Sequence, residues 1–335
     1  MILVTGGTGL VGSHLLAKLT KTETSVRAIY RSKKSIEKTK IVFKALKIDN
    51  QFEKIEWYQA DLLDYFELEK ALDCITHVYH AAAKVSFSSN DFDELMKVNV
   101  EGTAHLVNLA LEKGIQKLCY VSSVASLGSY PNNKPTDEEA IWQMNKNTSN
   151  YSVSKYYAEN EVWRASEEGL NVVIVNPATI IGFGDWQESS TAILKKVYDG
   201  LYFYPSGANG FVSVNDVVKA MVQLMNGDVK NERFLLVSKN MRFIDLFTMI
   251  AKGFNRKAPQ RLVSKKLAQS LIYLDFIRSK LTGKPVVLTK ESVDTAYRTK
   301  TFSSQKIREQ LGFEFEDLEL SIKETCGLYK KNKPQ

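Results

Sequence analysis

The chain has 335 residues, of which 44% are hydrophobic and 25% are charged, with only 18 glycines and 7 prolines. These proportions are those of an ordinary globular protein and exclude a collagen-like, disulfide-scaffold or disordered chain. The net charge of +7 comes from basic residues that look scattered apart from a run at 31–40 and a tail at 330–333. We therefore expect a solvated surface and no nucleic-acid partner.

The three cysteines are far apart and lie outside any Cys/His cluster, so we expect neither a disulfide framework nor a zinc site. The first strand-like run starts directly after Met1, and no apolar run reaches about 18 residues. We expect a cytoplasmic monomer or homodimer that is neither secreted by a signal peptide nor stably inserted in a membrane.

The first half of the chain alternates short β-branched runs with helix-like stretches, which is typical of βαβ units and a parallel sheet. We predict strands at 1–5, 25–30, 55–59, 77–81, 117–122, 171–176 and 233–238. Helices are predicted at about 10–20, 64–73, 91–113, 151–168 and 215–225. This order predicts an α/β fold with a doubly wound Rossmann-type sheet of about seven strands.

After Pro177 the strand rhythm largely disappears, and glycine, serine and aromatic residues with short helices take over. We predict a dinucleotide-binding domain over residues 1–176, with its sheet completed by about 208–240. A smaller, interleaved substrate-binding domain is predicted over 177–335.

A glycine-rich turn, Val4-Thr5-Gly6-Gly7-Thr8-Gly9-Leu10-Val11-Gly12, follows the first predicted strand and opens the first helix. Gly6 and Gly9 allow a tight turn and close approach of the backbone to a pyrophosphate, and Gly12 allows close packing of helix on strand. The helix N-terminus offers amide donors to the phosphates. The pattern predicts cofactor contacts from Gly6, Thr8, Gly9, Leu10, Val11 and Gly12.

The end of the second strand bears on the choice of cofactor. No carboxylate stands there to accept ribose hydroxyls, and Arg31 occupies the place where a 2′-phosphate would lie. We therefore expect NADP(H) rather than NAD(H); stacking on adenine and simple exposure to solvent are the alternatives for Arg31. After the third strand, Asp61 and Leu62 are candidates for the adenine edge, with a helix N-cap as the alternative for Asp61.

The fifth strand runs into Ser122-Ser123, and Tyr151 and Lys155 follow about thirty residues later at the head of a helix. Their spacing of four puts Tyr151 and Lys155 on one helical face. An adjacent ammonium and an oxidised nicotinamide both favour phenolate, which would bring the pKa of the tyrosine down from about 10. We predict hydride-transfer chemistry in which Ser123 holds the substrate oxygen and Tyr151 moves the proton.

Together, the glycine turn, Ser122-Ser123 and Tyr151-x-x-x-Lys155 resemble the extended short-chain dehydrogenases/reductases, the NAD-dependent epimerase/dehydratase group, over nearly the whole chain. The resemblance favours Ser123 over Ser122. For Asn99 a structural, helix-bending role is the alternative to a catalytic one. The catalytic residues implied by the resemblance are Ser123, Tyr151, Lys155 and Asn99. The further cofactor contacts it implies are Ala81, Ala82, Ala83, Tyr151, Lys155, Pro177 and Thr179.

Within that family, the segments 182–186, 209–216 and 283–289 look most like dihydroflavonol-reductase-like and 3β-hydroxysteroid-dehydrogenase-like members, which act on bulky, often apolar molecules. Nucleotide-sugar enzymes usually carry an arginine where Ala208-Asn209-Gly210 stand, and dehydratases carry Asp and Glu where Val124-Ala125 stand. The leading hypothesis is an NADPH-dependent ketone or aldehyde reductase, or the reverse alcohol dehydrogenase. The alternatives are a nucleotide-sugar epimerase or dehydratase, and a non-catalytic NADP-sensing protein.

Two weaker patterns remain. Aromatic and apolar residues that could line a substrate pocket, with core packing as the alternative, are Val85, Phe87, Trp186, Tyr202, Phe203 and Tyr204. In the stretch 264–280, residues Leu267, Leu271, Leu274 and Ile277 have helical spacing. We expect this stripe to pack on the substrate domain, and a membrane-surface helix is the alternative.

Overall fold

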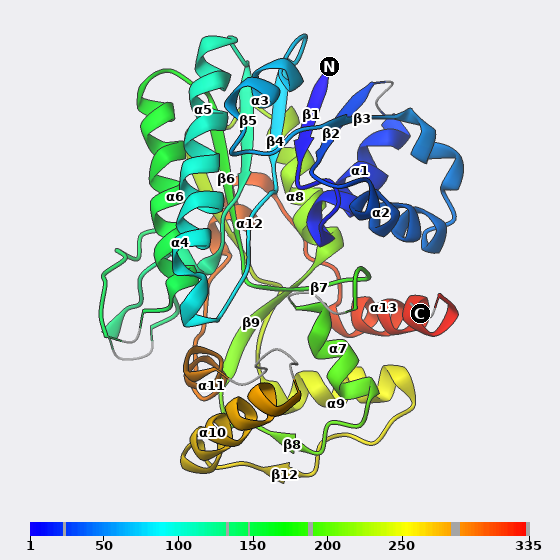
Figure 1. The fold of residues 1–335 in the computed structure, drawn as a ribbon, viewed down its shortest axis with the longest axis vertical. Helices are drawn as coiled ribbons and strands as arrows, with labels where there is room; N and C mark the ends of the chain where they lie inside the picture. Colours follow the sequence, from blue (N-terminus) through cyan, green and yellow to red (C-terminus); the bar gives the residue numbers. More distant parts are fainter. Residues whose placement is uncertain (23–24, 132–133, 147, 187–189, 283–288, 333–335) are drawn as a thin grey trace.

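The computed structural model describes residues 1–22, 25–131, 134–146, 148–186, 190–282 and 289–332 (Figure 1). A parallel seven-stranded sheet forms its centre, in the order β10-β6-β5-β4-β1-β2-β3. The strands are β1 (Ile2–Thr5), β2 (Val26–Tyr30), β3 (Ile55–Gln59), β4 (His77–His80), β5 (Lys117–Val121), β6 (Val172–Pro177) and β10 (Glu232–Leu236). All seven predicted strands and the doubly wound α/β class are confirmed.

Helices cover both faces of this sheet (Figure 1). One layer contains α1 (Leu10–Thr22), α2 (Lys33–Ala45) and α8 (Val214–Asn226); the other contains α3 (Tyr65–Ala71), α5 (Gly102–Glu112) and α6 (Asn150–Glu167). Successive strand residues belong to opposite cores: Val4 packs in the first and Leu3 in the second. This follows from the two-residue period of a strand, and it explains why the strands read as continuous apolar runs.

Two local features differ from the sequence prediction. Helix α2 was not predicted, because its exposed lysines hide the apolar spacing; it buries Thr39, Val42, Phe43 and Ala45. The predicted helix at 91–113 consists of α4 (Phe92–Leu95), the π-helical turn η3 (Met96–Glu101) and α5.

The second half of the chain builds most of the lower part of Figure 1. A three-stranded sheet contains β7 (Thr179–Ile181), β9 (Ala208–Ser213) and β11 (Lys239–Arg242). Helices α7 (Thr191–Tyr198), α9 (Phe243–Phe254) and α13 (Leu318–Lys331) enclose a separate apolar core with it. A two-stranded pair, β8 (Phe203–Tyr204) and β12 (Arg261–Leu262), precedes α10 (Lys265–Thr282) and α11 (Lys290–Ala296).

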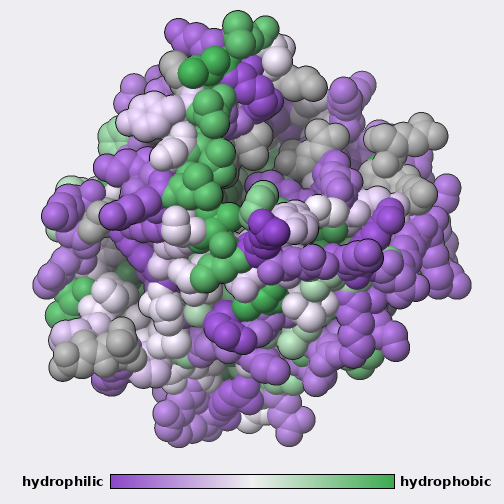
Figure 2. Space-filling model, turned by 90° about the horizontal axis from the view of Figure 1, so that it is seen from below, coloured by the Kyte–Doolittle hydropathy of each residue, from purple (hydrophilic) through white to green (hydrophobic). Residues whose placement is uncertain are grey.

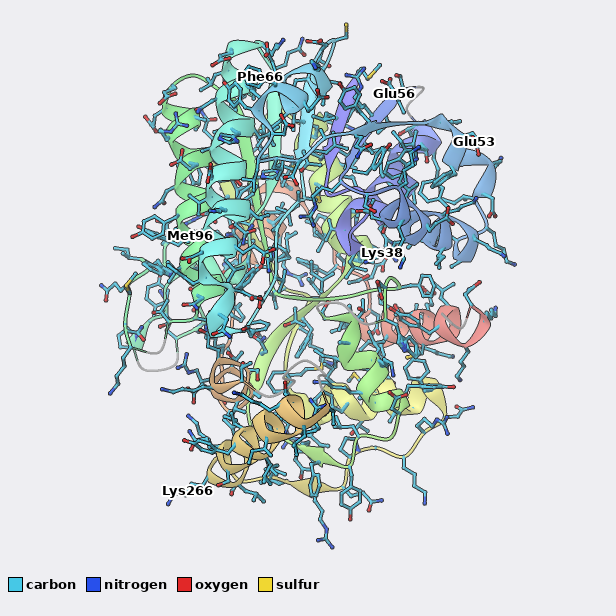
Figure 3. The ribbon with its side chains drawn as sticks, in the orientation of Figure 1. Lys38, Glu53, Glu56, Phe66, Met96 and Lys266 are labelled. Atoms are coloured by element: carbon cyan, nitrogen blue, oxygen red, sulfur yellow. The ribbon has the colours of Figure 1, made fainter. Side chains whose placement is uncertain are left out.

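The two halves are interleaved in sequence, as predicted. Strand β10 completes the central sheet by pairing with β6, and α12 (Gln305–Leu311) returns to pack against it through Ile307. An ion pair also links the parts: Lys38 of α2 lies 3.0 Å from Asp185, beyond β7 (Figure 3). The exact domain boundaries, 1–176 and 177–335, stay a prediction.

Helix α10 packs differently from the expectation. Its buried contacts come from Ala268 and Ile272, which meet Val263 and Val293, whereas Leu267, Leu274 and Ile277 are more than half exposed. Leu271 is partly buried. The expectation that the stripe packs on the substrate domain is therefore wrong for Leu267, Leu274 and Ile277. Among the described helices, none has the length and apolarity needed to cross a bilayer.

Candidate active site

The glycine turn forms a tight cradle between β1 and α1. Gly6 has a left-handed backbone (φ +67°), and a Cβ atom there would lie 2.5 Å from the Ala82 nitrogen. A Cβ atom on Gly12 would lie 2.1 Å from the Gly6 oxygen. The turn is closed by a 2.9 Å hydrogen bond from Gly9 N to Gly6 O, and α1 begins at the next residue. The free amide groups at the start of a helix can bind the pyrophosphate of a dinucleotide. Glycines in the turn let the backbone come close to that pyrophosphate, because they carry no side chain.

The elements around the turn hold it in place. Thr39 of α2 donates to the Gly7 oxygen at 2.9 Å. Beyond β4, Ala81 N donates to Thr5 O and Ala82 N to Thr5 Oγ1, both at 3.3 Å. The predicted cofactor segment 81–83 therefore runs beside the turn.

The predicted adenosine end is a shallow pocket of about 370 Å³, lined by Arg31, Gln59, Ala60, Asp61, Asp64 and Glu67. Arg31 directly follows β2 and is exposed. Asp61 accepts a 3.0 Å hydrogen bond from Leu63 N within its own turn. The N-cap of α3 is Asp64, so the N-cap alternative for Asp61 is wrong. Leu62 is buried in the core beneath this pocket edge.

The structure brings the predicted catalytic residues together. Ser123 caps the short turn after β5 and accepts from Ala125 N at 3.1 Å. A hydrogen bond from its hydroxyl to Tyr151 lowers the pKa of that phenol, but burial raises it more strongly. Tyr151 and Lys155 lie in the first turns of α6, whose N-cap is Ser149.

Lys155 is buried and makes its hydrogen bonds away from Tyr151. Its Nζ donates to Tyr120 OH at 2.6 Å and to Val121 O at 2.9 Å. Burial lowers the pKa of Lys155 to about 7, opposed by the carboxylate of Glu159. The expected downward shift of the Tyr151 pKa does not appear, because burial dominates and the ammonium is held by Tyr120 and Val121.

A buried hydrogen-bond chain that the sequence analysis missed lies behind Lys155. Tyr120 is hydrogen-bonded to Thr103, whose hydroxyl lies 3.0 Å from His80 Nε2. His80 Nδ1 lies 2.7 Å from Thr5 Oγ1, which accepts from Ala82 N. Burial, and then the charge of Lys155, lower the pKa of His80 to about 3, so the ring is neutral. This network lies between Lys155 and β1, the strand that precedes the glycine turn.

Asn99 lies in the π-helical turn η3, a distortion that often marks functional sites. Its side chain accepts from Lys84 N at 2.7 Å and donates to Lys84 O and Ser154 Oγ, both at 3.0 Å. These contacts tie the segment after β4 to α6 beside Lys155. They support a positioning role, and the catalytic assignment of Asn99 stays a prediction.

Glu159, one turn after Lys155, is a second group that the sequence analysis missed. Its carboxylate accepts from Ser126 Oγ at 2.7 Å and Asn176 Nδ2 at 2.8 Å, and Ser122 Oγ also donates to it. Its other oxygen pairs with Arg233 of β10 at 3.1 Å. The i, i+4 spacing from Lys155 was a usable signal for this buried network.

The predicted aromatic pocket is only partly supported. Phe87 lies beside Tyr151, with ring centroids 6.0 Å apart, and both Val85 and Phe87 are partly exposed. Trp186 instead packs in the lower core, 4.2 Å from the ring of Tyr329, so its assignment to a pocket is wrong. A pocket of about 470 Å³ includes Tyr202 but none of the predicted catalytic residues.

The region after β6 carries the last predicted cofactor residues. Pro177 ends β6, and Thr179 opens β7, where Asn209 Nδ2 donates to its hydroxyl at 3.1 Å. The backbone of Ala208 bonds to both Arg298 and Lys300, each at 3.0 Å. Burial and the charge of Arg298 lower the pKa of Lys300. The backbone of Arg298 and Lys300, about 90 residues away in sequence, therefore runs beside Ala208, where the arginine is missing.

The sequence matches the model of the NAD dependent epimerase/dehydratase family over residues 2–236. Sterol demethylase protein B of Methylococcus capsulatus is 27% identical over 274 residues, which cover 81% of this chain and 80% of that protein. Dihydroflavonol 4-reductase of Hordeum vulgare is 29% identical over 267 residues, covering 76% and 75%. UDP-glucose 4-epimerase from Thermotoga maritima shares the fold, with a TM-score of 0.78 at 22% identity over 99% of each chain.

Residues 283–288, part of one segment with subfamily resemblance, lie outside the described residues. The family match spans the glycine turn, the serine strand end, the Tyr-x-x-x-Lys helix and the whole central sheet. The chain therefore belongs to the NAD-dependent epimerase/dehydratase family of extended short-chain dehydrogenases/reductases and is an NAD(P)-dependent enzyme.

Proposed function

We propose that the chain is an NADPH-dependent ketone or aldehyde reductase, or the reverse alcohol dehydrogenase, acting on a bulky and largely apolar small molecule. The observation that carries the proposal is that the Ser123 hydroxyl lies near enough to Tyr151 to lower the pKa of its phenol, next to the apolar ring of Phe87. Such a site offers one oxygen two polar contacts and offers the rest of the substrate an apolar wall.

The residues divide the chemistry between them. Ser123 and Tyr151 hold the substrate oxygen, and the Tyr151 hydroxyl donates its proton to that oxygen. A bound nicotinamide supplies the hydride. The raised pKa of Tyr151 suits this direction, because the phenol stays protonated until the substrate oxygen takes the proton. Lys155 uses two donors on Tyr120 and Val121, and its third would hold a ribose hydroxyl.

The preference for NADPH rests on Arg31. It supplies the positive charge among the six residues of the adenosine-end pocket, where a 2′-phosphate would form charge-assisted hydrogen bonds. Asp61 and Asp64 line the same pocket and would instead favour the ribose hydroxyls of NAD. Titration with both cofactors decides between these contacts.

The catalytic proposal is tested by Tyr151→Phe. We expect nearly unchanged affinity for NADPH and a turnover reduced by roughly 10²–10⁴-fold, since the general acid is lost. Tyr157→Phe, an exposed tyrosine on the same helix, is the control and should behave like the wild type. Near wild-type turnover in Tyr151→Phe would overturn the assignment. A wild-type chain that binds NADPH but reduces no carbonyl compound would instead be a cofactor sensor.

A second candidate function is a nucleotide-sugar epimerase or dehydratase, favoured by Arg298 and Lys300 beside Ala208. A diphosphate brings about two negative charges that must be paired when buried. Against a dehydratase, Val124 and Ala125 stand beside the serine. We expect net oxidation of NADPH with apolar or aromatic carbonyl compounds and no turnover of UDP- or dTDP-sugars. Epimerised sugar without a net change in nicotinamide absorbance would establish the second candidate.

A further inference from the structure

The outer face of α10 is an exposed apolar surface. Tyr273, Leu274, Ile277 and Leu281 are between 53% and 81% exposed, and Leu267 and Leu262 of β12 extend the same group. We call these six residues the α10 surface. Figure 2 views the molecule from below, the side on which α10 lies in Figure 1, and a continuous hydrophobic band crosses that face. Apolar patches of this kind mark interaction sites.

The inner face of the helix explains why these side chains remain outside. Ala268 and Ile272 supply its contacts with Val263, Val293 and Tyr297. The helix is therefore apolar on two sides, and packing on the protein uses one of them. Helix α10 lies at the lower edge of the molecule (Figure 1), and the apolar residues on its remaining side are exposed.

Basic residues border this surface. The segment 256–282 contains seven of them, Arg256, Lys257, Arg261, Lys265, Lys266, Arg278 and Lys280, and one acidic residue, Asp275. Its net charge of +6 is nearly all of the +7 of the whole chain. Asp275 is largely buried and pairs with Arg278 at 2.8 Å. Lys265 pairs with Asp294 of α11 at 2.6 Å. The segment that contains α10 therefore carries most of the excess positive charge of the chain.

We propose that the α10 surface docks reversibly on an anionic phospholipid bilayer. Leucine, isoleucine and tyrosine side chains on a convex helix, flanked by lysine and arginine, suit the boundary between headgroups and acyl chains. The basic border adds attraction to anionic lipids. A second copy fits poorly, because a two-fold interface would bring two patches of like charge together. The proposal does not depend on the proposed reaction.

The first test is co-sedimentation with phosphatidylcholine vesicles that contain about 30 mol% phosphatidylserine. We expect the protein to bind these vesicles less tightly as the salt concentration rises. We also expect weaker binding to vesicles of phosphatidylcholine alone. Leu274→Gln with Ile277→Gln should lower the partition coefficient about tenfold or more, because two aliphatic side chains no longer enter the bilayer. The matched control, Phe66→Gln with Leu320→Gln, removes two exposed apolar residues elsewhere. Phe66 and Lys266 lie at opposite ends of the molecule (Figure 3).

The charge contribution is tested separately. Lys257→Glu with Lys266→Glu should lower binding to anionic vesicles roughly tenfold or more. Lys18→Glu with Lys323→Glu makes the same change in net charge at exposed positions on α1 and α13 and should bind like the wild type.

Circular dichroism and NADPH titration confirm that each variant is folded. The proposal is overturned if the wild type fails to bind anionic vesicles, or if the α10 variants bind as well as their controls. A dimer seen by light scattering and lost in Leu274→Gln with Ile277→Gln, without vesicle binding, would assign the face to a second copy. Binding of the chain to an immobilised acidic protein, without binding to vesicles, would assign the α10 surface to a protein partner.

Discussion

Replacing Glu159 by glutamine tests whether the buried carboxylate behind the active site holds the ends of β5 and β6 together. Glu159 is 2% exposed. One of its oxygens accepts from Ser122, Ser126 and Asn176, and the other accepts from Trp163 and Arg233. Glutamine replaces one of the two carboxylate oxygens with an NH₂ group, and this group then faces one of the two sets of donors. At least two hydrogen bonds are therefore lost, and Arg233 loses its counter-charge.

The magnitude follows from those contacts. A buried hydrogen bond to a charged group contributes about 1.5–3 kcal/mol. Arg233 keeps access to water, since its side chain is 25% exposed, so we discount its share. We expect a loss of about 3 kcal/mol, which for a chain of this length lowers Tm by about 4 °C. Removal of the negative charge also lowers the pKa of Lys155 further, because Glu159 is the group that raises it.

Differential scanning calorimetry measures the Tm, and the pH profile of kcat/KM reports the change at Lys155. Glu161→Gln is the matched control on the same helix: its carboxylate pairs with Arg164 at the surface and should contribute about 0.5 kcal/mol or less. Equal Tm values for the two variants would refute this account of the Glu159 network.

Three further predictions concern the cofactor site and pH. Arg31→Ser should weaken NADPH by about 1.5–3 kcal/mol and leave NADH nearly unchanged in fluorescence titrations; equal losses would rule out a 2′-phosphate contact. The pKa of Lys155 is about 7 in the folded chain and 10.5 in the unfolded chain, so the unfolded state binds more protons between these values and stability rises with pH there. Urea unfolding at pH 7.5 and 9 should show this rise in the wild type and lose it in Lys155→Met; an unchanged slope would contradict the buried assignment. Gly12→Ala puts a methyl group against the Gly6 backbone and should cost about 1–3 kcal/mol and at least tenfold in NADPH affinity. Gly327→Ala on α13 is its control, because a Cβ atom there would meet nothing within 4 Å. Equal melting temperatures for the two variants would show that the turn accommodates the methyl group.

Much of the geometry of the candidate site could be predicted from local sequence. The glycine turn requires a left-handed backbone at Gly6 and leaves no room for a Cβ atom at Gly12, and the Tyr151–Lys155 spacing fixes a shared helical face. The buried strands are continuous apolar runs, so their order along the chain predicted the central sheet. Helix α2 was not predicted because five of its thirteen residues are lysines, although Thr39, Val42 and Phe43 are buried in the core.

The environment of Lys155 depends on strand register, which cannot be predicted from any single segment of the sequence. Tyr120 reaches Lys155 and the ring of His80 because β5 pairs with β4 so that Tyr120 lies opposite His80. Burial in this environment lowers the pKa values of His80 on β4 and of Lys155 on α6.

By itself, the sequence determined features with a local physical cause: strand and helix periods, the turn that needs glycines, and the residue pair one helical turn apart. Tertiary structure decided which apolar residues were buried. Trp186 entered a core because Tyr329, 143 positions later in the chain, packs against it, whereas Leu274 stayed outside because Ala268 and Ile272 already supply the inner face of α10. Burial depends on the surface that a partner element offers, and that surface exists only after distant segments have packed together.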